Sequence, residues 1–160
     1  MFTCKSLLWI VKEEGKSWDG AYYRSEILPG VFNFLSDPEN VLSQEDVVIL
    51  HDKAPGWAAN STQDMLKESG YDFFSKSEWP GRSPDLNPAE HLGVLLKSRV
   101  DSLMSVEKDA NRFSMETLTE HVMTTLQNME SENELFENLL TSMKRRLDAV
   151  KNVSGGHTIY

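Results

Sequence analysis

The sequence has very little cysteine and no long hydrophobic run. Cys4 is the single cysteine among 160 residues, which excludes an internal disulfide framework. The longest apolar stretch near the N-terminus, Leu7–Val11, falls far short of the roughly 20 residues that span a bilayer, and it is too short for the core of a secretory signal. We therefore expect no membrane partner and a reducing compartment, cytoplasmic or nuclear.

Basic residues are also scarce. Lys and Arg total 16 against 25 Asp and Glu, which gives a formal net charge of −9 at pH 7. Proteins that hold nucleic acid through its phosphates usually carry a basic domain or stripe. The chain as a whole repels a polyanion, so a nucleic-acid role has to be local or bridged by a metal. Lys144–Arg146 with Lys151 forms the one basic cluster, and its place near a helix end favours a solvated terminus over a phosphate contact.

The first half of the chain alternates short apolar runs with helical patterns. Apolar residues make up 39% of the sequence and charged residues 26%, which fits one folded domain and argues against disorder. We expect strands at Ser6–Val11, Val47–Leu50 and Tyr71–Phe74. Helices are expected over Ala21–Leu35, with a bend at Pro29-Gly30, and over about Gln63–Ser69, where Gly70 is a good C-terminal cap.

The second half is helical. Asn87 and Pro88 predict a helix that starts there and runs to about Val106, and Ser114 caps a second helix over Met115–Met129. A capping box at Ser131–Glu134 opens the last helix, whose apolar face is Phe136, Leu139, Leu140, Met143, Leu147 and Val150. The sequence therefore predicts a single domain that covers residues 1–160. Residues 1–110 are the α/β part with a small sheet, and residues 111–160 form a helical C-terminal layer.

Two acidic residues stand at positions that suit chemistry. Asp52 follows an apolar strand, and Glu90 lies in the first turn of the helix that Asn87 opens. Carboxylates on a strand end and a facing helix can share a divalent metal. Plain structural roles stay open, because Asp52 can form a turn and Glu90 can complete the helix cap. His51 and His91 flank the two acids, but no paired His or Cys spacing supports a zinc site.

Four segments carry a more specific signal. The longest is Trp79-Pro80-Gly81-Arg82-Ser83-Pro84-Asp85-Leu86-Asn87-Pro88-Ala89-Glu90-His91-Leu92, preceded by Ile49-Leu50-His51-Asp52-Lys53-Ala54-Pro55. Looser ones are Ala21–Tyr23 with Glu26–Pro29, and a tail formed by Ser142–Leu147 with Gly155–Tyr160. In this order they resemble the catalytic domain of mariner-type transposases of the Tc/mariner superfamily. The resemblance covers nearly the whole chain, and its Ser83–Leu92 part is highly specific.

The resemblance implies an RNase H-like fold that cuts and joins DNA with Mg²⁺ (or Mn²⁺) held by an Asp-Asp-Glu triad, the DDE arrangement. Asp52 and Glu90 match the second and third catalytic carboxylates and would both ligate the metal. DNA, as transposon ends and target, would be the partner, and a homodimer is allowed. Thirty-seven residues separate Asp52 from Glu90, a few more than is commonest in the family.

The chain also departs from the family pattern. The family's first Asp lies on a strand well before the first conserved helix, whereas the only early acids here are Glu13, Glu14 and Asp19. The first Asp, two strands and the DNA-reading region are thus expected to be missing. Loss of the central strand would separate Ser6–Val11 from Val47–Leu50 and expose sheet edges. We interpret the chain as a truncated catalytic-domain fragment that does not transpose alone. The alternative is a non-catalytic remnant or acidic protein-interaction module.

Overall fold

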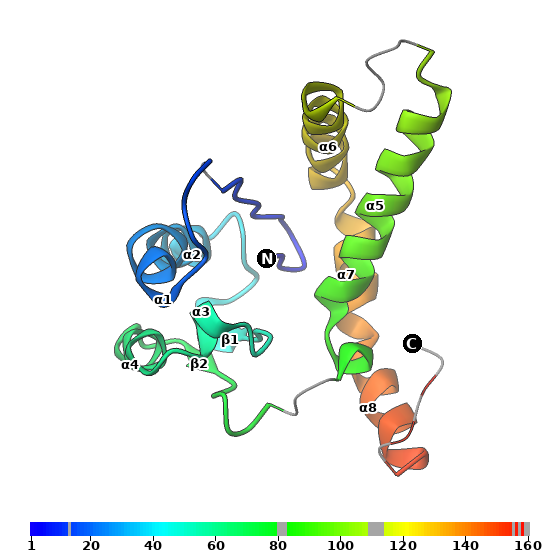
Figure 1. Ribbon diagram of the computed structural model, residues 1–160. Helices are drawn as coiled ribbons and strands as arrows, with labels where there is room; N and C mark the ends of the chain where they lie inside the picture. The colour runs from blue at the N-terminus through cyan, green and yellow to red at the C-terminus, as the bar shows by residue number, and fades with distance from the viewer. Residues whose placement is uncertain (13, 80–82, 109–113, 155, 157, 159–160) are drawn as a thin grey trace.

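The structure is a computed structural model, and it describes residues 1–12, 14–79, 83–108, 114–154, 156 and 158. Two groups of elements lie on either side of the N-terminal segment (Figure 1). One group is α1 Gly20–Tyr22, a π-helical turn Tyr23–Ile27, α2 Leu28–Ser36, a 3₁₀ turn Gln44–Asp46, β1 Val48–Ile49, α3 Pro55–Ala58, α4 Asn60–Glu68 and β2 Asp72–Phe73. The other is a 3₁₀ turn Pro84–Leu86, α5 Pro88–Val106, α6 Met115–Glu130, α7 Asn133–Thr141 and α8 Met143–Asn152. Among the described helices, none has the length and hydropathy needed to cross a bilayer.

The first helix runs through α1, the π turn and α2, which confirms the helix expected over Ala21–Leu35. Its irregularity lies before the proline, where the Leu28 N–H donates to the Tyr23 carbonyl five residues back. Pro29 has no N–H and its ring crowds the carbonyl of Ser25, so a wider turn relieves the clash. The buried face of α2 consists of Leu28, Val31 and Leu35.

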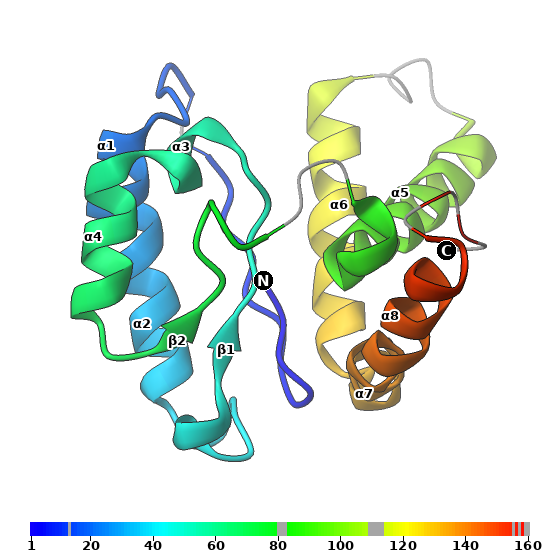
Figure 2. The same ribbon diagram turned by 90° about the horizontal axis from the view of Figure 1, so that it is seen from below.

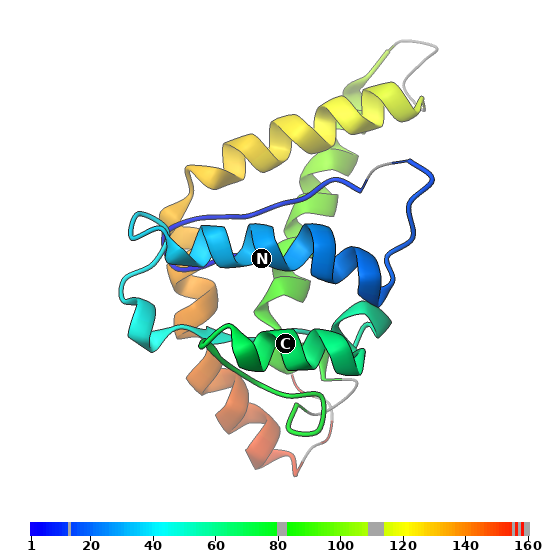
Figure 3. The ribbon, with the colours of Figure 1, turned by 90° about the vertical axis from the view of Figure 1, so that its left-hand side faces the viewer.

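The sheet of the described residues has two parallel strands, with Val48 paired to Asp72 and Ile49 to Phe73. It confirms strands within Val47–Leu50 and Tyr71–Phe74, although the paired parts are shorter. The helices α2 and α4 run side by side over one face of this sheet (Figure 3). Between helices and sheet lies a core of Ile27, Leu28, Val31, Leu35, Val41, Ile49 and Leu66. Gly70 ends α4 with a positive φ of 80°, as its expected cap role requires.

The strand expected at Ser6–Val11 is wrong. Its only ladder contact in the described residues is an isolated antiparallel bridge between Phe2 and Leu7. The segment passes between the sheet and the helices α5–α8 (Figure 2) and contacts both sides, since Leu8 and Ile10 pack against the first core. Leu7 packs in a second core cluster with Leu126, Met129 and Phe136, and the Trp9 Nε1 donates to Glu130 Oε1 at 2.7 Å. Leu7 is buried by these contacts without a strand neighbour, whereas Val11 at the end of the run is exposed.

The helical layer confirms two of the three expected helix starts. Asn87 Oδ1 accepts the Ala89 N–H at 3.1 Å, and Ser114 Oγ accepts the Thr117 N–H at 3.1 Å. The capping box at Ser131–Glu134 is wrong. Ser131 ends α6 by donating to the Asn128 carbonyl, and the Glu132 carboxylate forms an ion pair with Arg99 that lowers the pKa of Glu132.

The last helix is divided into α7 and α8 at Ser142, whose hydroxyl donates to the Leu139 carbonyl at 2.6 Å. Phe136 is fully buried, as the apolar pattern predicts, but Leu147 is 52% exposed. The buried position in this turn belongs to Arg146 instead. The expected apolar face is therefore wrong at Leu147.

Candidate functional site

Asp52 follows β1 by three residues and lines a groove of about 600 Å³ between the two groups of elements. Its side chain is exposed, and Oδ1 accepts the Ala54 N–H at 3.1 Å. This contact is the turn-forming role that the sequence left open. Asn87, Pro88 and Ala89 at the start of α5 line the same groove. The fold thus brings the end of β1 and the beginning of α5 to one cavity.

His51 holds the backbone of Asp52 in place. The imidazole is 4% exposed and stacks on Trp57, with ring centroids 5.1 Å apart and planes 10° apart. Its Nε2 lies 3.2 Å from the Gln63 amide nitrogen, and its Nδ1 lies 2.5 Å from the Asp52 carbonyl. An amide nitrogen only donates, so Nε2 accepts and the Nδ1 proton is donated to the Asp52 carbonyl. His51 is therefore a positioning residue, which accepts at Nε2 and donates from Nδ1 in this arrangement.

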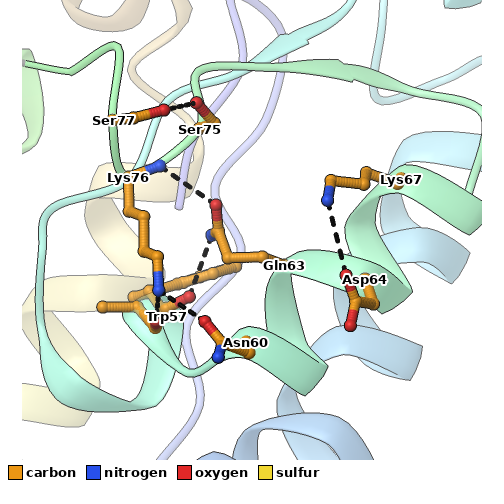
Figure 4. Close-up of polar contacts among 9 residues, drawn as sticks. Trp57, Asn60, Gln63, Asp64, Lys67, Ser75, Lys76 and Ser77 are labelled. Atoms are coloured by element: carbon orange, nitrogen blue, oxygen red, sulfur yellow. Dashed lines mark hydrogen bonds and ion pairs between the residues drawn. The ribbon is translucent and has the colours of Figure 1, made fainter.

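Gln63 joins the loops that follow the two strands. Its amide nitrogen donates to the Trp57 carbonyl at 2.9 Å, and its Oε1 accepts the Lys76 N–H at 3.0 Å (Figure 4). The Lys76 ammonium in turn donates to Asn60 Oδ1 at 2.6 Å. Gln63 is 5% exposed, and these bonds satisfy its amide without water. The buried amide was not foreseen as part of the site.

Tyr23 and Gly56 pack tightly beside Asp52. Burial raises the pKa of Tyr23, and the negative charge of Asp52 raises it further. A Cβ on Gly56 would lie 2.3 Å from the Tyr23 ring, so only glycine fits there without displacement. Trp57 contacts the same ring edge-on, with centroids 5.3 Å apart. Trp57 and the buried Trp79 thus act in packing.

Glu90 lies in the first turn of α5 and its side chain is exposed. To complete the helix cap, its carboxylate would have to accept the Asn87 N–H. That N–H donates to the Pro84 carbonyl at 3.0 Å instead, so Glu90 does not complete the cap. In the part of the chain that the structure describes, no hydrogen bond or ion pair involves the Glu90 carboxylate. Glu90 is not among the residues that line the groove. The structure therefore places the start of its helix, rather than the carboxylate itself, on the groove shared with Asp52.

Arg146 anchors the segment that carries Glu90. The guanidinium is 3% exposed and donates from Nε to Ser142 Oγ at 2.7 Å and from Nη1 to the Asp85 carbonyl at 3.0 Å. It also lies 2.8 Å from His91 Nε2, which must accept. Burial lowers the pKa of His91, and the Arg146 charge lowers it further, against smaller opposite effects of Asp85 and Glu90. The expected basic cluster therefore loses Arg146, which acts inside the fold.

The remaining acids that the structure describes do not complete a metal centre. Among the described residues, no group of three His, Cys, Asp or Glu side chains could hold an ion. Asp19 Oδ1 accepts the Tyr22 N–H at 2.9 Å and caps α1, while Glu13 lies outside the described residues. The same holds for Pro80–Arg82 in the longest family string and for Gly155, His157, Ile159 and Tyr160 in the tail. The roles of Asp52 and Glu90 as metal ligands stay predictions.

The chain is similar to two curated transposases. It is 31% identical over 83 residues to the transposable element Tc1 transposase of Caenorhabditis elegans, and equally to the Tcb1 transposase of Caenorhabditis briggsae. The match covers 52% of this chain and 27% of each relative, so it spans about a quarter of their length. No family model and no solved structure matches. Over about half of its length, the chain is therefore related to transposases of the Tc1/mariner type.

Proposed function

We propose that the chain is a transposase-derived DNA-processing domain of the DDE type, which supplies Asp52 and Glu90 as two metal-binding carboxylates and does not cut DNA by itself. The relationship to the Tc1 and Tcb1 transposases carries this proposal. Two features of the fold support it: Asp52 follows the half-buried strand β1, and the first turn of α5 reaches the same groove. A parallel strand pair with helices on both sides is compatible with part of an RNase H-like domain.

The donor set fits Mg²⁺ or Mn²⁺ only in part. Carboxylate oxygens are the right ligands for these ions, and Mg²⁺ is usually bound by one or two carboxylates together with substrate phosphates and water. One oxygen of Asp52 is already an acceptor for Ala54, and the described residues bring no third acid to the pair. Asp52 and Glu90 alone therefore make an incomplete and weak metal site, and we assign no catalytic step to them. Cleavage requires a further carboxylate from outside the described residues.

Paramagnetic Mn²⁺ tests whether the two carboxylates share an ion. Addition of Mn²⁺ should broaden the backbone resonances around Asp52 and Glu90 together, at millimolar affinity, because two exposed carboxylates bind weakly. The broadening at both positions should disappear in Asp52→Asn and in Glu90→Gln. Asp101→Asn, an exposed acid further along α5, is the matched control and should leave it unchanged. Broadening at only one of the two positions, or persistence in either variant, would contradict a shared site.

The acidic composition favours a second candidate, a protein-interaction module of transposase descent. A net charge of −9 opposes binding to a polyanion. Fluorescence anisotropy with a labelled DNA duplex, in Mg²⁺ and at low salt, separates the two candidates. Saturable binding that weakens with salt and depends on Mg²⁺ supports the DNA-processing role. Absence of DNA binding at micromolar protein concentration would favour the protein-interaction module over the DNA-processing role.

A further inference from the structure

One edge of the small sheet is unpaired. Ile49 faces β2, because its carbonyl accepts the Phe74 N–H at 3.2 Å and its pair partner is Phe73. Successive residues of a strand direct their backbone groups to opposite sides, so those of Val48 and Leu50 are directed away from β2. Within the described residues, the backbone N–H and C=O groups of Val48 and Leu50 have no hydrogen-bond partner. This edge presents two donors and two acceptors in an extended row.

The 600 Å³ groove runs along this unpaired edge. Tyr23, Leu35 and Val41 line it from the side of α2, and Pro88, Ala89 and Leu140 line it from the side of the helical layer; residues 1–4 close it opposite β1. The two layers on either side of the sheet are visible in Figure 1. The groove thus has walls on both sides of β1, as a position inside a sheet does, while Val48 on β1 itself is 52% exposed.

We propose that this groove binds an extended strand of a partner protein, which pairs with the free edge of β1 and carries consecutive apolar residues with a basic residue at each end. The apolar run follows from the apolar walls on both faces, because a strand buried on both sides is hydrophobic throughout. The basic ends follow from Asp46 and Asp52, exposed acids that line the groove before and after β1.

Other ligands meet this groove less well. A small apolar molecule would fill the volume but leave the backbone groups of Val48 and Leu50 unpaired, which is costly once water is excluded. A nucleic-acid strand would bring phosphates toward Asp46 and Asp52. Main-chain pairing supplies the missing donors and acceptors, as in other complexes where a peptide adds to a sheet edge. The proposal does not depend on metal binding by Asp52 or Glu90.

The test uses the full chain in metal-free buffer and a synthetic peptide of about eight residues, which covers about 26 Å when extended. The peptide has valine and isoleucine throughout and a lysine at each end, with both termini blocked. We expect saturable binding, and hydrogen exchange at the amides of Val48 and Leu50 should slow by about tenfold or more. A peptide with glutamate at each end should bind about fivefold more weakly or less well still.

Val48→Pro is the specific variant and Val48→Thr its matched control. Proline removes one unpaired N–H, and an edge position whose N–H faces solvent tolerates it. Val47 already has φ −76° and ψ 122°, which suits a residue before proline. Peptide affinity should fall by about tenfold or more in Val48→Pro and stay within about twofold in Val48→Thr.

Several results would overturn the proposal. They are absence of peptide binding at millimolar concentration, binding without protection of Val48 and Leu50, and equal affinity in both Val48 variants. Protection without peptide, increasing with protein concentration alongside a dimer in sedimentation, would assign the groove to a second copy of the chain. Should Val48→Pro fail to fold, the exchange pattern and the comparison of lysine-ended with glutamate-ended peptides still decide the question in the unmodified chain.

Discussion

Replacing Arg146 with glutamine tests whether its buried guanidinium holds the start of α5 against α8. The side chain is 3% exposed and donates to Ser142, to the Asp85 carbonyl and to His91. A hydrogen bond to a charged group contributes about 1.5–3 kcal/mol, and a buried acceptor left unpaired costs about 1–3 kcal/mol. The three bonds share one group and do not add independently. We therefore expect the free energy of unfolding to fall by about 3–5 kcal/mol.

Urea unfolding followed by circular dichroism measures this loss. With a slope of about 2 kcal/mol per molar urea, the midpoint should fall by about 2 M. Arg145→Gln removes the same charge from an exposed neighbour and should change the free energy of unfolding by less than about 0.5 kcal/mol. A loss in Arg146→Gln no larger than in Arg145→Gln would refute the anchoring role.

Two further predictions concern His91 and the glycines. The pKa of His91 is lowered from 6.5 in the folded chain, so the unfolded chain binds more protons below that pH. Stability should therefore decrease as the pH falls below about 6.5, and His91→Gln should reduce this slope in thermal unfolding measured at several pH values. Gly56→Ala should lower the free energy of unfolding by about 1–3 kcal/mol, because the added Cβ meets the Tyr23 ring. Gly93 has open space around it on α5, so Gly93→Ala should raise the free energy of unfolding by about 0.5–1 kcal/mol. Chemical unfolding of both variants checks these opposite signs.

The strands show what an apolar run can and cannot predict. The runs at Val47–Leu50 and Tyr71–Phe74 pair as β1 and β2 and are covered by α2 and α4. The run at Ser6–Val11 is equally apolar, yet it has no ladder beyond a single bridge. An apolar pattern reports burial, and Leu7 is indeed buried. Strand formation needs a neighbour to pair with, and which segment is the neighbour is not a local property of the sequence.

The site was predictable where its signals are local. The cap at Asn87 and the position of Asp52 after an apolar run depend on residues close in sequence, and both are present as expected. The polar contacts that position them join residues far apart, such as Arg146 to Asp85 and His91. A buried arginine is rare, so a basic triplet at Lys144–Arg146 indicates surface. One signal was available: Arg146 follows Met143 by three residues, on the helix face that carries the apolar stripe.

The free edge and the candidate carboxylate share one end of the groove, because Asp52 follows Leu50 by two residues. A strand paired with β1 therefore ends beside Asp52. The residue at that end of the strand determines whether Asp52 forms an ion pair or shares a cation with a second carboxylate. A lysine there pairs with the Asp52 carboxylate and competes with a metal for it. An aspartate there adds a second carboxylate, whose repulsion is offset only when a cation binds between them. Titrating both peptides with and without Mg²⁺ separates these cases. Mg²⁺ should lower the affinity for the lysine-ended peptide and raise the affinity for an aspartate-ended one. Tighter binding of the aspartate-ended peptide in Mg²⁺ would show that strand docking and metal binding occur at a single site.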